Sequence, residues 1–121
     1  MPKFFGDKIL MRIFIGESDK YGRKPLYEAL IDYFIKEGFA GATVLRGVAG
    51  FGAHSLYHTD KLLRLSTDLP LIIEVVASQE KLDKAMPMID EMMSGGLITT
   101  ETVNVVRYCN KDDKKCVLSE P

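Results

Sequence analysis

The sequence predicts an α+β domain whose strands and helices follow one another in the order βαββαβ. Residues 9–15 alternate between apolar and mixed positions, which is typical of a strand with one buried face. Two longer segments, about 24–37 and 79–93, repeat apolar residues at spacings of three and four, as helices with one buried stripe do. Residues 71–77 are almost continuously apolar, and such a run favours a strand in the middle of a sheet.

The first strand and the first helix can be predicted in some detail. One face of the strand is apolar and consists of Ile9, Met11, Ile13 and Ile15. A polar, turn-like stretch over 16–23 follows. Pro25 can open the helix, because the N–H that proline lacks would have no acceptor within the first helical turn. The helix stripe consists of Leu26, Ala29, Leu30, Tyr33 and Phe34. Gly38 stands where a left-handed residue commonly ends a helix.

The second helix and the last strand carry two expected interruptions. Ser78 can cap the helix, whose inward residues are Leu82, Ala85, Met86, Ile89 and Met93. Pro87 lies inside it, so we expect a kink or a broken first half. The last strand is expected at Ile98 and over 103–108, with a break at 100–102.

Joined by right-handed crossovers, these elements form a ferredoxin-like fold: a four-stranded antiparallel sheet in the order 4-1-3-2, with two helices on one face. The other face would leave Leu10, Phe14 and their cross-strand neighbours uncovered. An apolar surface of that extent is unusual on a stable monomer. The sequence therefore predicts self-association.

Length and charge exclude several classes of protein. We expect one domain over 1–121, with a core of about 9–108 and a charged C-terminal tail over 109–121. A net charge of −1 argues against bulk phosphate neutralisation, and therefore against a nucleic-acid binder. No apolar run approaches the roughly 20 residues that span a bilayer, and no signal-peptide core is present. We therefore expect a cytoplasmic protein that is not itself a membrane protein.

A glycine-rich stretch after the second strand is the strongest candidate for a binding site. The predicted strand over 40–48 leads into G-x-x-G-x-G at 47–52, which is neither a dinucleotide fingerprint nor a P-loop. Glycines let backbone N–H groups approach an anion closely. Positive charge gathers around them, on Arg46, His54, His58, Lys61 and Arg64. Residues 55–66 fit either a continued excursion or a short helix over 60–65.

Four motifs together resemble a known family. They are IGESDK at 15–20, GATVLRG at 41–47, GFGA at 50–53 and LRLSTDLP at 63–70. The combination, with TV-x5-GFG over 43–52, resembles the PII-like signalling proteins of domain-of-unknown-function family 190. The resemblance covers about 9–108.

The resemblance implies a homotrimer that binds an adenine nucleotide between subunits, regulates a partner such as a membrane transporter, and signals through a mobile loop. Thr43, Gly50 and Gly52 match nucleotide-site residues of PII proteins, and Arg107 matches a phosphate-binding arginine. Three departures make AMP or ADP more plausible than a magnesium–ATP complex. The TV-to-GFG spacing is one residue longer, His54 replaces a magnesium-holding glutamine, and the lysine-bearing phosphate loop is absent. The predicted binding residues are Thr43, Arg46, Gly47, Gly50, Phe51, Gly52, His58 and Arg107.

Two other classes of function remain open. One is a metal-binding trimer that uses His54, His58 or the cysteines, although two histidines make an incomplete site and we expect no metal. The other is a small enzyme that uses Glu74 and a histidine. No catalytic spacing is visible, so we expect no enzyme, and we expect Glu74 to pair with Arg12 or Arg46.

The two cysteines, Cys109 and Cys116, allow a disulfide, a metal pair or reduced thiols. Reduced thiols are expected, because the reducing cytosol keeps most cysteines in that state.

Overall fold

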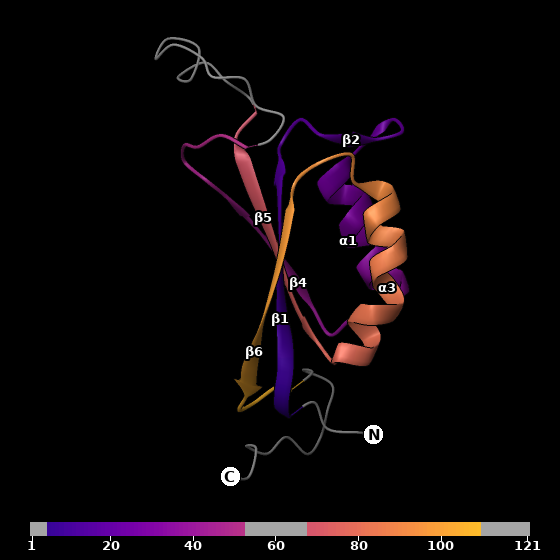
Figure 1. The fold of residues 1–121 in the computed structure, drawn as a ribbon, viewed down its shortest axis with the longest axis vertical. Helices are drawn as coiled ribbons and strands as arrows, with labels where there is room; N and C mark the ends of the chain where they lie inside the picture. The colour runs from indigo at the N-terminus through magenta and orange to yellow at the C-terminus, as the bar shows by residue number, and fades with distance from the viewer. Residues whose placement is uncertain (1–4, 53–67, 110–121) are drawn as a thin grey trace.

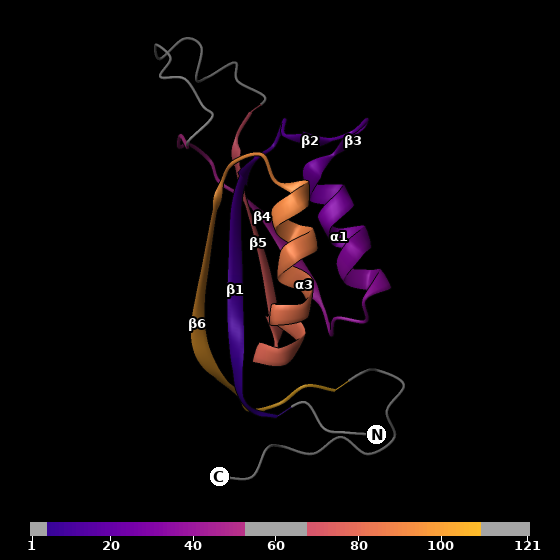
Figure 2. The same ribbon diagram turned by 45° about the vertical axis from the view of Figure 1, so that its right-hand side comes forward.

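The computed structural model of the chain describes residues 5–52 and 68–109. Four strands form one antiparallel sheet in the order β4-β5-β1-β6, as the sequence predicted. In chain order these strands are β1 (Gly6–Gly16), β4 (Ala42–Arg46), β5 (Pro70–Ala77) and β6 (Leu97–Val105). Helices α1 (Leu26–Lys36) and α3 (Gln79–Met92) both lie against one face of the sheet, and Figures 1 and 2 show the other face uncovered by any described element.

The core lies between the sheet and the two helices. In the register of β5, β1 and β6, Ile13 of β1 stands opposite Ile73 on one side and Ile98 on the other. Alternate residues of β1 and β5 point to the helices and are buried: Met11, Ile13, Ile15, Leu71, Ile73, Val75 and Ala77. The helices contribute Leu26, Ala29, Leu30, Phe34, Leu82, Ala85, Ile89 and Met92. Both helical stripes were predicted, except that Met92 rather than Met93 is the buried residue at the end of α3.

The predicted helix caps are confirmed. Gly38 has φ +74°, its N–H donates to Ile35 O at 3.1 Å, and the Phe39 N–H donates to Phe34 O at 3.0 Å. This pair of bonds is a Schellman motif, and the Phe34 and Phe39 rings pack on each other at 4.8 Å, as its hydrophobic contact requires. At α3, the Ser78 hydroxyl accepts a hydrogen bond from the Lys81 N–H at 3.1 Å.

Both expected interruptions are wrong. Helix α3 runs unbroken through Pro87, which is exposed, so its ring faces solvent while the buried stripe holds the helix on the sheet. Strand β6 runs unbroken through Thr99, Thr100 and Thr102, which pair with Arg12, Met11 and Ile9 of β1. A strand at the sheet edge can expose polar side chains, and threonine suits strands well. Backbone pairing with β1 therefore decides the structure of this segment.

Several boundaries also differ from the prediction. Strand β4 ends at Arg46 and not at residue 48, and β6 ends at Val105, which leaves Arg107 and Tyr108 beyond the strand. The stretch expected as a turn contains a small hairpin of β2 (Lys20–Tyr21) and β3 (Lys24–Pro25).

Cys109 is disulfide-bonded, so the expectation of a reduced thiol is wrong. Cys116, His54, His58 and the short helix over 60–65 lie outside the described residues. Within the described part of the chain, neither helix is long and apolar enough to cross a membrane.

Candidate anion site at the root of the glycine-rich loop

Three segments meet at one end of the sheet and form what we term the loop root: the turn 16–19 after β1, residues 46–47 at the end of β4, and residues 68–70 before β5. They meet because β1 and β4 end where antiparallel β5 begins. The Glu17 N–H donates to Leu69 O at 2.8 Å, and the Gly47 N–H donates to Pro70 O at 2.7 Å. The turn therefore joins directly to the β5 side of the root.

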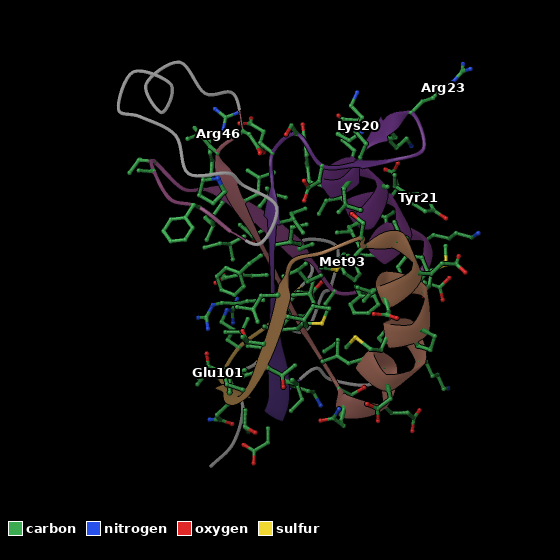
Figure 3. The ribbon with its side chains drawn as sticks, turned by 45° about the horizontal axis from the view of Figure 1, so that its top comes forward. Lys20, Tyr21, Arg23, Arg46, Met93 and Glu101 are labelled. Carbon is green, nitrogen blue, oxygen red and sulfur yellow. The ribbon has the colours of Figure 1, made fainter. Side chains whose placement is uncertain are left out.

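Arg46 supplies the positive charge of the loop root. It is the last residue of β4, and its side chain is 61% exposed. Figure 3 shows it at the end of the sheet next to the turn after β1. Its Nη2 forms an ion pair with Glu17 Oε2, and the Glu17 side chain is only 22% exposed. Arg46, which we predicted to bind phosphate, thus lies where β4 ends and the glycine-rich segment begins, and it is paired with a carboxylate.

Glu17 is the residue of this site that sequence reasoning missed. It lies within the IGESDK motif, but the contact spans 29 positions in the chain, and no local pattern reports such a distance. Two more carboxylates fix the turn around it. Asp19 Oδ2 accepts from the Gly16 N–H at 3.0 Å, and Asp68 Oδ1 accepts from the Ser18 N–H at 3.1 Å.

The glycines of the loop are explained in part by packing. A Cβ on Gly47 would lie 2.7 Å from Cγ of Pro70, which is too close for any side chain. Gly50 has φ +151°, and a Cβ there would lie 3.2 Å from the same Cγ. No described residue comes within 4 Å of a Cβ placed on Gly52, and Phe51 between these glycines is exposed. Pro70 therefore excludes a side chain at Gly47, and the positive φ together with Pro70 disfavours one at Gly50.

Two of the remaining predicted site residues, Thr43 and Arg107, do not converge on Arg46. Thr43 is exposed on β4, opposite Glu74 in the register. Arg107 follows β6 at the other end of the sheet, and the hydroxyl of the adjacent Tyr108 donates to Ala40 O at 3.1 Å. The rise of an extended chain puts Ala40 about 20 Å from Arg46. One chain therefore does not bring Arg46 and Arg107 to one phosphate.

On the uncovered face of the sheet, an ion-pair cluster spans three strands. Arg12 Nε donates to Glu74 Oε2 at 2.9 Å, which confirms the predicted arginine partner of Glu74. Arg12 Nη1 also donates to Glu101 Oε1 at 2.5 Å. These two hydrogen bonds raise the pKa of Arg12. With its carboxylate in an ion pair, Glu74 is a poor candidate for a general base.

Apolar side chains surround this cluster on the same face. Phe14 stands opposite Ile72 and Leu97, and Leu10 stands opposite Val76. Leu45 and Leu97 are 44% and 57% exposed. The uncovered face is therefore apolar around an ionic centre.

Two hollows lie in the helical layer. One of about 390 Å³ lies at the start of α3 and is lined by Phe39, Glu80, Lys81 and Lys84, among others. The other, of about 360 Å³, lies between the helices and is lined by Tyr21, Tyr33, Met88 and Met92, among others. None of the predicted site residues lines either hollow. Over residues 5–52 and 68–109, no group of three potential ligands could hold a metal.

The fold is the one that PII-like proteins have. Solved structures of CPII, a nitrogen regulatory PII-like protein from Thiomonas intermedia K12, have the same fold. The structure bound to ADP and bicarbonate matches with a TM-score of 0.54 at 17% identity, over 86% of this chain and 93% of that one. The structure bound to ADP, AMP and acetate matches with a TM-score of 0.55 at 16% identity, with the same coverage.

The sequence places the chain in a specific family. The model of the family DUF190, described as "Uncharacterized ACR, COG1993", matches residues 8–105, and the chain belongs to this family. A UPF0166 protein of Aquifex aeolicus is 35% identical over 99 residues, which cover 82% of this chain and 93% of that protein. UPF0166 protein MJ1524 of Methanocaldococcus jannaschii is 31% identical over 99 residues, which cover 81% and 91%. The resemblance inferred from the four motifs is confirmed.

Proposed function

We propose that this chain is a PII-like regulatory protein that binds an adenine nucleotide, AMP or ADP, in clefts between the subunits of a homotrimer. The observation that carries the proposal is the loop root, where exposed Arg46 ends β4 and a glycine-rich segment begins. A guanidinium and free backbone N–H groups suit a phosphate group. The CPII structures with this fold are bound to ADP or to ADP and AMP, which supports the choice of ligand.

The two predicted phosphate arginines favour a site that subunits share. Arg46 and Arg107 lie at opposite ends of β4, too far apart for one phosphate. In our proposal, one subunit contributes Arg46, Gly47, Gly50, Phe51, Gly52 and His58, and its neighbour contributes Arg107. Thr43 is exposed on β4, between the end of the strand that carries Arg46 and the end near Tyr108.

The uncovered sheet face supports the assembly. Burying Leu10, Phe14, Leu45, Ile72 and Leu97 against other copies would remove apolar area from water, at about 25 cal/mol per Å². The helices then remain outside and the loop roots lie near the subunit boundaries.

In this proposal the protein is not an enzyme and works in the cytoplasm. Nucleotide binding changes the conformation of the glycine-rich loop, and a regulated partner, such as a membrane transporter, distinguishes the two states.

Calorimetric titration with AMP, ADP, ATP, cyclic AMP and divalent metal ions tests the ligand. We expect AMP or ADP to bind most tightly, and metal ions alone not to bind. If zinc or copper bound tightly and no adenine nucleotide did, the metal-binding alternative would replace the proposal.

A further inference from the structure

We propose that Glu17 regulates the anion site by competing with the ligand for Arg46. Its carboxylate holds Arg46 against the turn after β1, and a phosphate that binds Arg46 must take the guanidinium from it. Glu17 is then a positioning residue that links ligand binding to the loop root. This inference rests on the proposed function, because it concerns the same arginine.

Glu17 is fixed in place while Arg46 has room to move. The Glu17 N–H is bonded to Leu69 O, and its side chain is 22% exposed. The two hydrogen bonds from Gly16 to Asp19 and from Ser18 to Asp68 hold the residues on either side of it. The Arg46 side chain is 61% exposed. A change of partner therefore requires only the arginine side chain to move.

The charge around the turn makes this exchange costly. A Cβ on Gly16 would lie 2.6 Å from Asp68 Oδ1 and 3.3 Å from Asp19 Oδ1, so both carboxylates pack over this residue. Once Arg46 turns to a phosphate, the Glu17 carboxylate loses its ion-pair partner, in a turn to which the carboxylates of Asp19 and Asp68 are also bonded. Competition and repulsion both oppose an anion at Arg46, so both predict that removing the Glu17 charge strengthens anion binding.

The exchange would also act on the structure of the loop root. The Arg46 side chain links the end of β4 to the turn, while the turn bonds to residues 68–69 before β5. When Arg46 leaves Glu17, the side-chain link on the β4 side is lost and the β5 side stays bonded. The glycine-rich residues 47–52, which directly follow Arg46, would then be held less firmly where they leave β4.

Calorimetry with ADP on the full-length protein tests the competition. We expect Glu17→Gln to tighten ADP binding about threefold to fivefold, the upper part of the range that a partly exposed ion pair allows. In an Arg46→Ala background the same substitution should change ADP affinity less than about twofold, because the contested guanidinium is gone. Glu80→Gln is the matched control, since it removes the same charge from an exposed pair with Lys84 at the start of α3.

Unchanged or weaker ADP binding in Glu17→Gln would overturn the inference and leave the proposed function standing, provided that Arg46→Ala weakens binding. An equal gain in the Arg46→Ala background would overturn it as well, because a general charge effect would explain the result.

Hydrogen exchange tests, without any ligand, whether the ion pair of Arg46 with Glu17 holds the loop root together. We expect Glu17→Gln to speed exchange of the Gly47 amide, which bonds to Pro70 O, about tenfold, relative to the Ile73 amide in the central sheet. An unchanged exchange rate of the Gly47 amide would overturn the inference about Glu17, whether or not the protein binds an adenine nucleotide. Failure of the wild-type protein to bind any adenine nucleotide would refute the proposed function.

Discussion

Arg46 is positioned by β4, and its ion-pair partner Glu17 lies in the turn that follows β1. The apolar run before it and the glycines after it predicted correctly that the strand would carry this arginine to the loop. The ion pair with Glu17 could not be predicted, because it depends on how β5 pairs with both β1 and β4. Arg107 shows the same limit. Its place in the chain suggested a phosphate contact, but strand direction puts it at the other end of the sheet.

Arg46→Ala should weaken ADP binding by about 1.5 to 3 kcal/mol, the usual contribution of a hydrogen bond to a charged group. The lower part of that range is expected, because the pair with Glu17 is lost as ADP binds. Calorimetry measures the change. Arg23→Ala is the control, since Arg23 points into solvent from the β2–β3 hairpin (Figure 3). Equal ADP affinity in wild type and Arg46→Ala would place the phosphate site elsewhere.

The helices and the central strands were predictable because their side chains repeat with one clear period. The stripes of α1 and α3 follow from spacings of three and four, and their ends follow from Ser78 and Gly38. Strand β6 was harder, because Thr99 to Thr102 carry no apolar signal and are held as a strand by their pairing with β1. The break predicted at Pro87 does not occur for a related reason: packing of the buried stripe of α3 outweighs one missing backbone hydrogen bond.

The glycines of the glycine-rich segment differ in how closely they are packed, so substituting them should affect stability differently. Gly47→Ala should lower the free energy of unfolding by about 1 to 3 kcal/mol, because its Cβ would overlap Cγ of Pro70. Gly52→Ala, whose Cβ meets no described residue within 4 Å, should leave that free energy nearly unchanged. Urea denaturation of both variants measures the difference. Equal stability of the two variants would show that the contact of Gly47 with Pro70 is unimportant.

The assembly as a whole should not depend on metal. His54 and His58 are the chain's two histidines, and two ligands make an incomplete site. We therefore expect the double variant His54→Ala/His58→Ala to keep the circular dichroism and the molar mass of the wild type. Light scattering before and after treatment with EDTA provides the measurement. Assembly that is lost in EDTA and returns with zinc or copper would support the metal-binding alternative.

The shape of the single chain explains why assembly is expected. Both helices cover one face of the sheet (Figure 2). The other face combines apolar side chains with the Arg12 cluster. One arginine with two glutamates is an ionic group that is costly to bury unless its geometry is good. Here Glu74 and Glu101 bond to separate nitrogens of Arg12, so the group enters an interface with its strongest hydrogen bonds already made.

A charge placed on the uncovered face should therefore dissociate the trimer. Leu97 is 57% exposed on that face and Ile35 is 71% exposed on α1, so glutamate at either position should leave the fold of the single chain intact. Only Leu97→Glu should bury a charge at the subunit boundary. The carboxylate would lose its hydration there and gain no partner, which disfavours association. Light scattering should give about 41 kDa for the wild type and Ile35→Glu, three times the 13.6 kDa of the chain, and a lower mass for Leu97→Glu. A wild type that weighs 13.6 kDa at micromolar concentration would refute both the trimer and the shared nucleotide site.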